Sequence, residues 1–131
     1  TIYRNIARYP DARTTPGVRA LRIDAPLFFA NTAFLKDTIT DAVADGDVEH
    51  LVVDCKAISS IDAQALATLD EIVAELHRRG VQLWLSGVRG PVRDALAAAG
   101  LTARIGADHI VECVYDAVKR AAGPQRTAQP A

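Results

Sequence analysis

LVVDCKAISSIDAQALATLDEIVAEL, residues 51–76, is the most informative segment of the chain. It opens with a continuous apolar run at residues 51–53, which is typical of a strand buried on both faces of a parallel sheet. A polar turn follows, and from Ala63 onward the apolar residues recur at the spacing of a helix. The residues of this apolar stripe are Leu66, Leu69, Val73 and Leu76. The segment therefore predicts a strand, a turn and an amphipathic helix.

The start of the predicted helix carries a capping pattern. Asp62 is a favourable N-cap, since its carboxylate can accept hydrogen bonds from the backbone N–H groups of Gln64 and Ala65. Ile61 and Leu66 are spaced to pack over the cap as a hydrophobic staple. The pattern predicts that the helix begins directly after Asp62.

Strands and helices alternate on both sides of this segment. Further strands are predicted within residues 1–9 and at residues 18–23 and 81–85, and further helices at residues 32–46 and 91–100. Alternation with short connections is typical of a largely parallel or mixed sheet covered by helices. The predicted fold class is therefore α/β, with about five strands and about four helices.

The composition predicts one soluble domain. A chain of 131 residues can bury a single core, and its 50% hydrophobic and 24% charged residues argue against disorder. A net charge of -1 gives no basic field, so no nucleic-acid partner is predicted. No apolar run reaches the roughly 18 residues that cross a bilayer. The absence of Met favours a piece of a longer protein, and Cys55 and Cys113 are expected to be reduced thiols.

The central segment resembles a known family. Its VVD run, the apolar and polar turn that follows, and the pair Ile61-Asp62 before a small-residue helix start are similar to the signature of STAS domains. These domains are shared by anti-sigma factor antagonists and by the cytoplasmic C-terminal ends of SulP-type sulfate permeases. A second block favours the permease branch, and it consists of Tyr9-Pro10, Pro16-Gly17, the strand at residues 18–23 and the run DAPLFFAN at residues 24–31.

The resemblance covers about residues 9–122 and implies the STAS fold. It implies a single domain over residues 1–122, and residues 123–131 are expected to form a disordered tail because they lack an apolar period. It also implies a short strand at residues 110–112 and a helix at residues 114–122. The residues alone leave open one helix over residues 108–120.

The function implied by the resemblance is that of a regulatory and interaction domain of a SulP-type sulfate or anion transporter. Its partner would be the transmembrane domain of the same transporter, at the cytoplasmic face of the membrane. The alternative is a free-standing anti-sigma factor antagonist that switches partners. In the antagonists a kinase phosphorylates a serine directly after the Asp, and Ala63 stands at that position here. Alanine has no hydroxyl group, so this switch is not expected.

Three turns are expected to meet at the carboxyl ends of the strands, where open α/β sheets collect ligands: residues 26–31, 56–64 and 86–90. Some STAS domains bind guanine or adenine nucleotides, so the resemblance implies GTP or GDP as a ligand. The candidate nucleotide-binding residues are Ser59, Ser60, Asp62, Ala63, Gln64, Ser86, Gly87 and Arg89. The candidate partner-binding residues are Phe28, Phe29 and Asn31.

Two observations oppose a nucleotide site. The carboxylate of Asp62 would repel a phosphate, and the chain contains no G-x-x-x-x-G-K-[ST] loop. Ordinary turn and capping roles explain the same residues without a ligand, and that interpretation stays open.

No enzymatic activity, required cofactor or metal site is predicted. Cys55 has no evident adjacent base, and the three histidines and two cysteines show no metal-ligand spacing. Asp54 ends a strand where a response-regulator receiver keeps its phosphorylated aspartate. Asp24 is followed by Ala25, so the acidic pair of a receiver is missing, and Asp54 is interpreted as a strand-end hydrogen-bonding residue.

Overall fold

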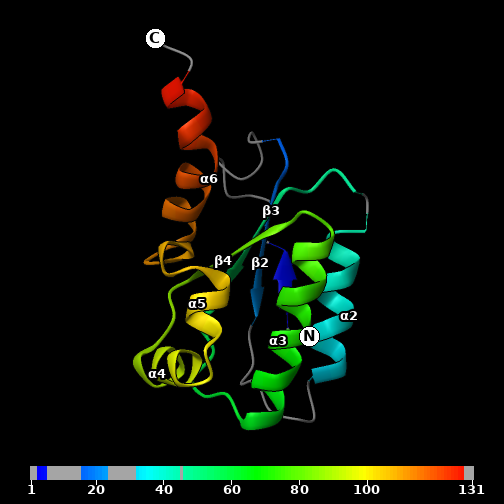
Figure 1. Ribbon diagram of the computed structural model, residues 1–131, viewed down its shortest axis with the longest axis vertical. Coiled ribbons are helices and arrows are strands. Elements are labelled where there is room, and N and C mark those ends of the chain that lie inside the picture. Colours follow the sequence, from blue (N-terminus) through cyan, green and yellow to red (C-terminus); the bar gives the residue numbers. More distant parts are fainter. Residues whose placement is uncertain (1–2, 6–15, 24–31, 45, 129–131) are drawn as a thin grey trace.

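The fold is built on one five-stranded sheet with strand order β1-β2-β3-β4-β5 (Figure 1). This computed structural model describes residues 3–5, 16–23, 32–44 and 46–128. Strand β1 pairs antiparallel with β2, and β2 to β5 are parallel neighbours. The strands are β1 (Tyr3–Asn5), β2 (Val18–Ile23), β3 (His50–Asp54), β4 (Gln82–Ser86) and β5 (Ile110–Val111). The predicted α/β class with a largely parallel sheet is confirmed.

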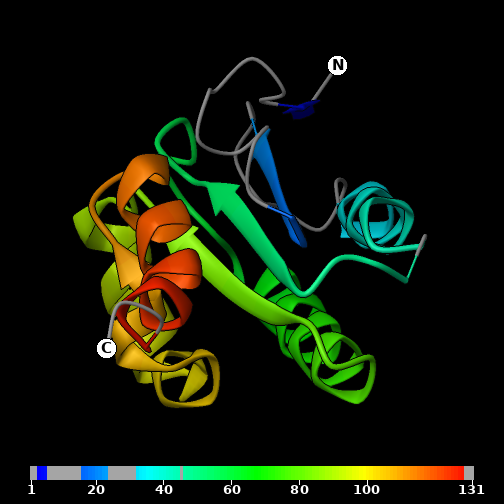
Figure 2. The same ribbon diagram turned by 90° about the horizontal axis from the view of Figure 1, so that it is seen from above.

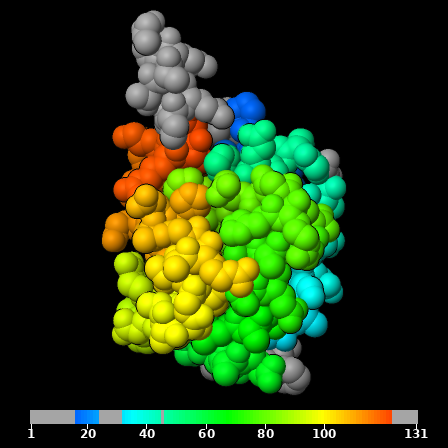
Figure 3. All heavy atoms as spheres, viewed as in Figure 1, coloured from blue at the N-terminus to red at the C-terminus, as the bar shows by residue number. Residues whose placement is uncertain are grey.

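Helices cover both faces of the sheet (Figure 2). The helices are α2 (Thr32–Ala42), α3 (Ala63–Arg78), α4 (Gly90–Ala98), α5 (Leu101–Ile105) and α6 (Val114–Ala128), with a 3-10 turn η2 (Ala107–His109) before β5. Helices α2 to α5 pack on one face in the larger apolar cluster, and α6 packs on the other face in a smaller cluster. Figure 3 shows α4, α5 and α3 side by side on the surface of the larger layer.

Strand β3 is central in this arrangement because it is buried on both sides. Leu51 and Val53 belong to the larger cluster, whereas Val52 belongs to the smaller one. Side chains alternate between the faces of a strand, so a continuous apolar run supplies both cores at once. The interpretation of residues 51–53 as a doubly covered strand is confirmed.

The region after β4 differs from the prediction. One helix over residues 91–100 was expected, whereas α4 ends at Ala98 and a separate helix α5 follows. Gly100 lies between them with φ 79°, a left-handed conformation that interrupts a helix. Leu101 and Ile105 of α5 are both buried, at a spacing of one helical turn.

The C-terminal region follows the family pattern. The structure contains β5 and then α6, so the single helix over residues 108–120 is wrong. Helix α6 begins at Val114 as expected and ends at Ala128 instead of Ala122. The division into a domain of residues 1–122 and a tail stays a prediction.

Candidate functional site

Two loops lie side by side at the carboxyl ends of β3 and β4. We call residues 55–62 the β3–α3 loop and residues 87–89 the β4–α4 loop. The backbone N–H of Cys55 donates to the Ser86 carbonyl at 2.8 Å. The Nε of Arg89 donates to the Lys56 carbonyl at 2.8 Å. The predicted meeting of the turns after β3 and β4 is therefore confirmed, and Arg89 ties the two loops together.

Gly87 permits the close approach of these loops. Its φ is +65°, and a Cβ built at this position would lie 3.4 Å from Lys56 Cβ and 3.5 Å from Asp54 Oδ1. Its backbone N–H donates to the Val111 carbonyl of β5 at 3.1 Å. A glycine is needed here because other residues rarely adopt a positive φ. The β4–α4 loop is thus joined to β5 as well as to the β3–α3 loop.

The β3–α3 loop is held by a buried side chain and by hydrogen bonds in its first turn. Ile58 is only 1% exposed and belongs to the larger apolar cluster. Its N–H donates to the Cys55 carbonyl at 2.9 Å, and Asp54 Oδ1 accepts from the Lys56 N–H at 3.0 Å. The interpretation of Asp54 as a strand-end hydrogen-bonding residue is confirmed.

The N-terminus of α3 is capped as expected. Asp62 Oδ1 accepts from the Ala65 N–H at 2.8 Å, and α3 begins at the next residue after Asp62. Ile61 and Leu66 are partly buried and pack against the larger cluster, where the predicted staple would lie. Asp62 is partly buried at the N-terminus of α3, where the helix dipole favours its negative charge.

The candidate nucleotide-binding residues differ in their accessibility. Those exposed to solvent are Ser59, Ala63, Gln64 and Arg89, and those partly buried are Ser60, Asp62 and Gly87. Ser86 differs, because it is 0% exposed and its Oγ has no hydrogen-bond partner within the described part of the chain. The Ser86 hydroxyl therefore does not reach the surface that the other residues form. Phe28, Phe29 and Asn31 lie outside the described residues.

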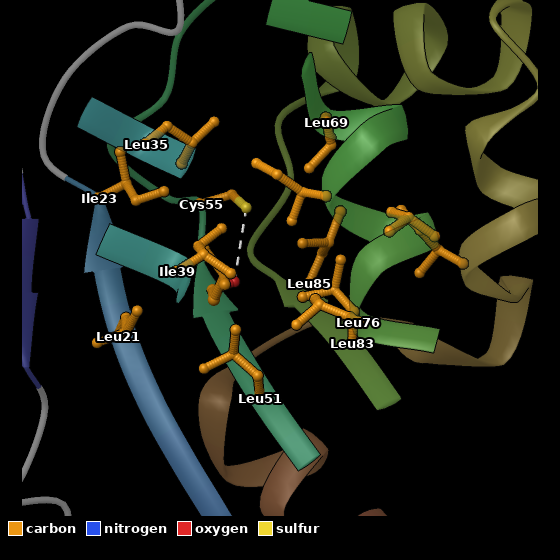
Figure 4. Packing of buried hydrophobic residues seen from close by; sticks show 14 of the residues in the cluster. Leu21, Ile23, Leu35, Ile39, Leu51, Cys55, Leu69, Leu76, Leu83 and Leu85 are labelled. Carbon is orange, nitrogen blue, oxygen red and sulfur yellow. Dashed lines mark hydrogen bonds between the residues drawn. The ribbon is translucent and has the colours of Figure 1, made fainter. Parts of the chain in front are cut away.

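A small apolar cavity lies beneath the β3–α3 loop, between the sheet and the helices of the larger layer (Figure 4). Its lining includes Ile23, Leu35, Cys55, Ile58 and Leu69. Each lining residue in the described part of the chain is apolar or a cysteine, so these residues offer no charged group to a phosphate. A nucleotide at this end of the sheet would have to lie over the loops.

The two cysteines have opposite environments. Cys55 is buried, and its Sγ donates to the Val53 carbonyl at 3.5 Å, whereas Cys113 is exposed. Burial, together with the neighbouring charge of Asp54, raises the pKa of the Cys55 thiol to about 12. Both thiols are free, as expected.

Thiol reagents are therefore expected to distinguish the cysteines. At pH 8 a thiol with a pKa of about 12 is ionised in about one molecule in 10⁴, and only the thiolate reacts. Native protein treated with iodoacetamide should carry one label, on Cys113, by mass spectrometry. Unfolded protein should carry two, and Cys113→Ser should carry none in the native state. Labelling of Cys55 at the rate of Cys113 would contradict this environment.

Within residues 3–5, 16–23, 32–44 and 46–128, no group of three or more His, Cys, Asp or Glu side chains is arranged to hold a metal ion. No helix in this described part has both the length and the apolar character required to span a membrane.

Comparisons with known proteins identify the family that shares this sequence and fold. The chain belongs to the STAS domain family, because the family model matches residues 9–121. The predicted STAS fold and the kinship with SulP sulfate transporters are thus confirmed.

Individual relatives define the branch. A probable sulfate transporter of Mycobacterium tuberculosis is 38% identical over 117 residues, which cover 88% of this chain and 21% of the transporter. The crystal structure of a sulfate transporter family protein from Wolinella succinogenes has a TM-score of 0.72 and 26% identity, over 80% of this chain and 84% of that one. The chain spans about a fifth of the length of the curated sulfate transporters it matches.

The antagonist branch shares the architecture. A putative anti-sigma factor antagonist from Thermotoga maritima has a TM-score of 0.69 at 16% identity, over 86% of this chain and 97% of that one. At this identity the likeness shows the fold alone.

Proposed function

We propose that this chain is the cytoplasmic regulatory and interaction domain of a SulP-type sulfate or anion transporter. The observation that carries the proposal is the 38% identity with the Mycobacterium tuberculosis protein across most of the chain. The partner would be the transmembrane domain of the same transporter, which would contain the transport path. The domain would adjust transport through its contacts and would catalyse no reaction.

The proposal is tested on the full-length protein. Reading the coding sequence upstream of Thr1 should reveal several membrane-spanning segments, and a start codon directly before Thr1 would overturn the proposal. Sulfate uptake into cells or vesicles should depend on the folded domain. A full-length variant with Ile58→Ala, which removes the buried anchor of the β3–α3 loop, should lose uptake, whereas Arg93→Ala on the exposed side of α4 should retain it.

For the loop site we propose GTP or GDP as the ligand. The N-terminal N–H groups of α3 and α4 adjoin the two loops, and such groups favour phosphate. Arg89 is exposed, and its Nε bond to the Lys56 carbonyl anchors the guanidinium beside both loops. Its remaining N–H groups can donate to phosphate oxygens. The Asp62 carboxylate opposes this binding by repulsion.

The nucleotide proposal predicts opposite effects for two substitutions. Arg89→Ala should weaken GTP binding about 10-fold or more, since a hydrogen bond to a charged group contributes roughly 1.5–3 kcal/mol. Asp62→Asn should tighten binding, because Asn caps helices as well as Asp and carries no charge. Amide chemical shifts on titration with GTP, GDP and ATP provide the measurement, with Arg93→Ala as the matched control. Absence of shifts at residues 59–64 and 87–89 would contradict the site.

The partner-switching alternative is weakened by one exposed residue. Ala63 occupies the first position of α3 and is exposed, so a kinase could reach this position but would find no hydroxyl group. Incubation with anti-sigma kinases followed by mass spectrometry tests the alternative. Phosphate on Ser59, Ser60 or Thr68 would favour it over the transporter proposal.

A further inference from the structure

Three aromatic rings that are distant in the sequence meet on the face of the sheet covered by α6. His50 begins β3, Trp84 lies in β4, and His109 ends η2. The His109 ring stacks on the indole of Trp84 with centroids 3.9 Å apart and planes 5° from parallel. The His50 ring lies 6.1 Å from the indole and is tilted by 51°. We call these residues the ring cluster.

Two hydrogen bonds fix the proton positions on these rings. Trp84 Nε1 donates to His50 Nδ1 at 3.1 Å, and an indole N–H can only donate. His50 Nδ1 is therefore the unprotonated nitrogen of a neutral ring. His109 Nδ1 lies 2.9 Å from the Leu83 carbonyl, which can only accept, so this nitrogen carries a proton.

Adding a second proton to a neutral imidazole ring affects the hydrogen bonds of His50 and His109 differently. A protonated His50 presents N–H at both nitrogens, so the bond from Trp84 is lost and a buried indole N–H, in a residue only 6% exposed, has no acceptor. A protonated His109 keeps its bond to Leu83 and gains a cation–π attraction to the indole. Two charged rings would also repel each other. His50 is thus the proton-sensitive member.

We propose that the ring cluster is a pH-sensitive contact, in which the bond from Trp84 of β4 to His50 of β3 is made while His50 is neutral and is lost when His50 binds a proton. The indole that loses this bond is the one on which the ring of His109 stacks. His109 is the last residue of η2, and β5 follows directly. Two bonds extend from this region, since Arg120 Nη1 donates to the Asp108 carbonyl at 3.2 Å and Gly87 N–H donates to the Val111 carbonyl at 3.1 Å. The contact is thereby connected to α6 and to the β4–α4 loop.

The surroundings of His50 contain few charges within the described residues. Burial lowers its pKa below the usual 6.5, the carboxylate of Glu49 raises it, and His109 lowers it again, with burial the largest cause. The neighbours from β2 and α6 in this cluster are uncharged, namely Ala20, Ala117, Val118 and Ala121, and Gln82 is the residue beside His50 on β4. The charged residues of η2 and of the first two turns of α6 are Asp108, Asp116, Lys119 and Arg120.

The direction of the pH effect follows from the lowered pKa of His50. The unfolded chain binds a proton near pH 6.5, whereas the folded chain binds it only at lower pH. The stabilisation by neutral His50 is therefore complete above pH 6.5 and is lost as the pH falls through the folded pKa. One such group lowers the folding equilibrium constant by up to about tenfold per pH unit.

The test follows Trp84, which is the only tryptophan of the chain. The indole N–H resonance of the full 131-residue chain is recorded from pH 8 to pH 5 together with the histidine ring signals. We expect the indole resonance to move with the midpoint of His50. In His50→Asn the amide oxygen replaces Nδ1 as acceptor and does not titrate, so the indole resonance should stay nearly constant.

Two further variants separate the roles. His109→Asn keeps a donor for the Leu83 carbonyl and removes the stacked ring, so the indole resonance should still titrate with His50. His77→Asn, at an exposed position on α3, should behave as wild type. Urea unfolding at pH 8, 6.5 and 5 should show a smaller pH dependence for His50→Asn than for wild type. A wild-type indole resonance that does not move, or that moves equally in His50→Asn, would overturn the proposal.

Discussion

Replacing Ile58 with alanine is expected to lower the free energy of unfolding by about 2–5 kcal/mol. The side chain is 1% exposed and lies in the larger apolar cluster, so its loss removes buried apolar contacts and leaves a cavity. Folded domains are stable by only about 5–15 kcal/mol in total. Urea unfolding followed by circular dichroism measures the change as a lower midpoint at an unchanged slope.

Ile61→Ala is the matched control for this prediction. Ile61 belongs to the same loop and undergoes the same chemical change, but it is only partly buried against the cluster. Its substitution should cost less than that of Ile58, because less apolar surface returns to water. Equal costs at the two positions would show that Ile58 is not the anchor of the β3–α3 loop.

Gly87→Ala is expected to destabilise the domain by about 1–2 kcal/mol. The backbone at this position has φ +65°, which an alanine adopts only with strain. The added methyl group would also lie 3.4 Å from Lys56 Cβ, a tight contact at the junction of the two loops. Thermal or urea unfolding measures the loss, and a weaker Arg89 contact should broaden the amide signals of the β3–α3 loop.

Gly90→Ala provides the comparison for Gly87. Gly90 is the first residue of α4, its φ is not positive, and nothing lies within 4 Å of an added Cβ. Alanine is favoured over glycine within a helix by roughly 0.5–1 kcal/mol, so this variant should be as stable as wild type or more stable. If both alanine variants behaved alike, the left-handed conformation of Gly87 would not be a requirement of the fold.

The predictable parts of the fold depend on local patterns. The change from a continuous apolar run to a helical period at Ala63 placed β3 and α3 correctly, and Asp62 marked the boundary through its capping chemistry. These signals lie within a few residues of one another, so no tertiary information was needed. Helix α5 was missed because five residues contain too little of a helical period to be separated from α4.

The site was only partly predictable. The turns after β3 and β4 were expected to meet, since the carboxyl ends of parallel strands share one edge of a sheet. The burial of Ser86 could have been inferred from its place at the end of a strand covered on both faces, with Trp84 two residues earlier on the same side. The bond from Arg89 to the Lys56 carbonyl could not have been inferred from the sequence. Its donor and acceptor are 33 residues apart, and no local pattern specifies the pair.

The ring cluster contains one contact that the sequence could have predicted and one that it could not. Trp84 pairs with Val52 of β3, and Val52 lies two residues after His50. Since side chains alternate between the faces of a strand, His50, Val52 and Trp84 lie on the same face of the sheet. His109 follows α5 and η2, and its position depends on how these short elements turn back to the sheet. A sequence in which the three histidines are scattered therefore gave no indication that two of them meet at one tryptophan.

The contact between His109 and the Leu83 carbonyl has a consequence for self-association. Strand β5 has two residues and pairs with β4 at Leu85 and Ser86, so no strand of the described residues lies beside the first part of β4 on that side. Unpaired carbonyl groups at a sheet margin attract extended segments of other molecules, which is a common start of aggregation. The imidazole of His109 occupies the Leu83 carbonyl and covers the adjacent indole, and thus shields this margin from extended segments of other molecules.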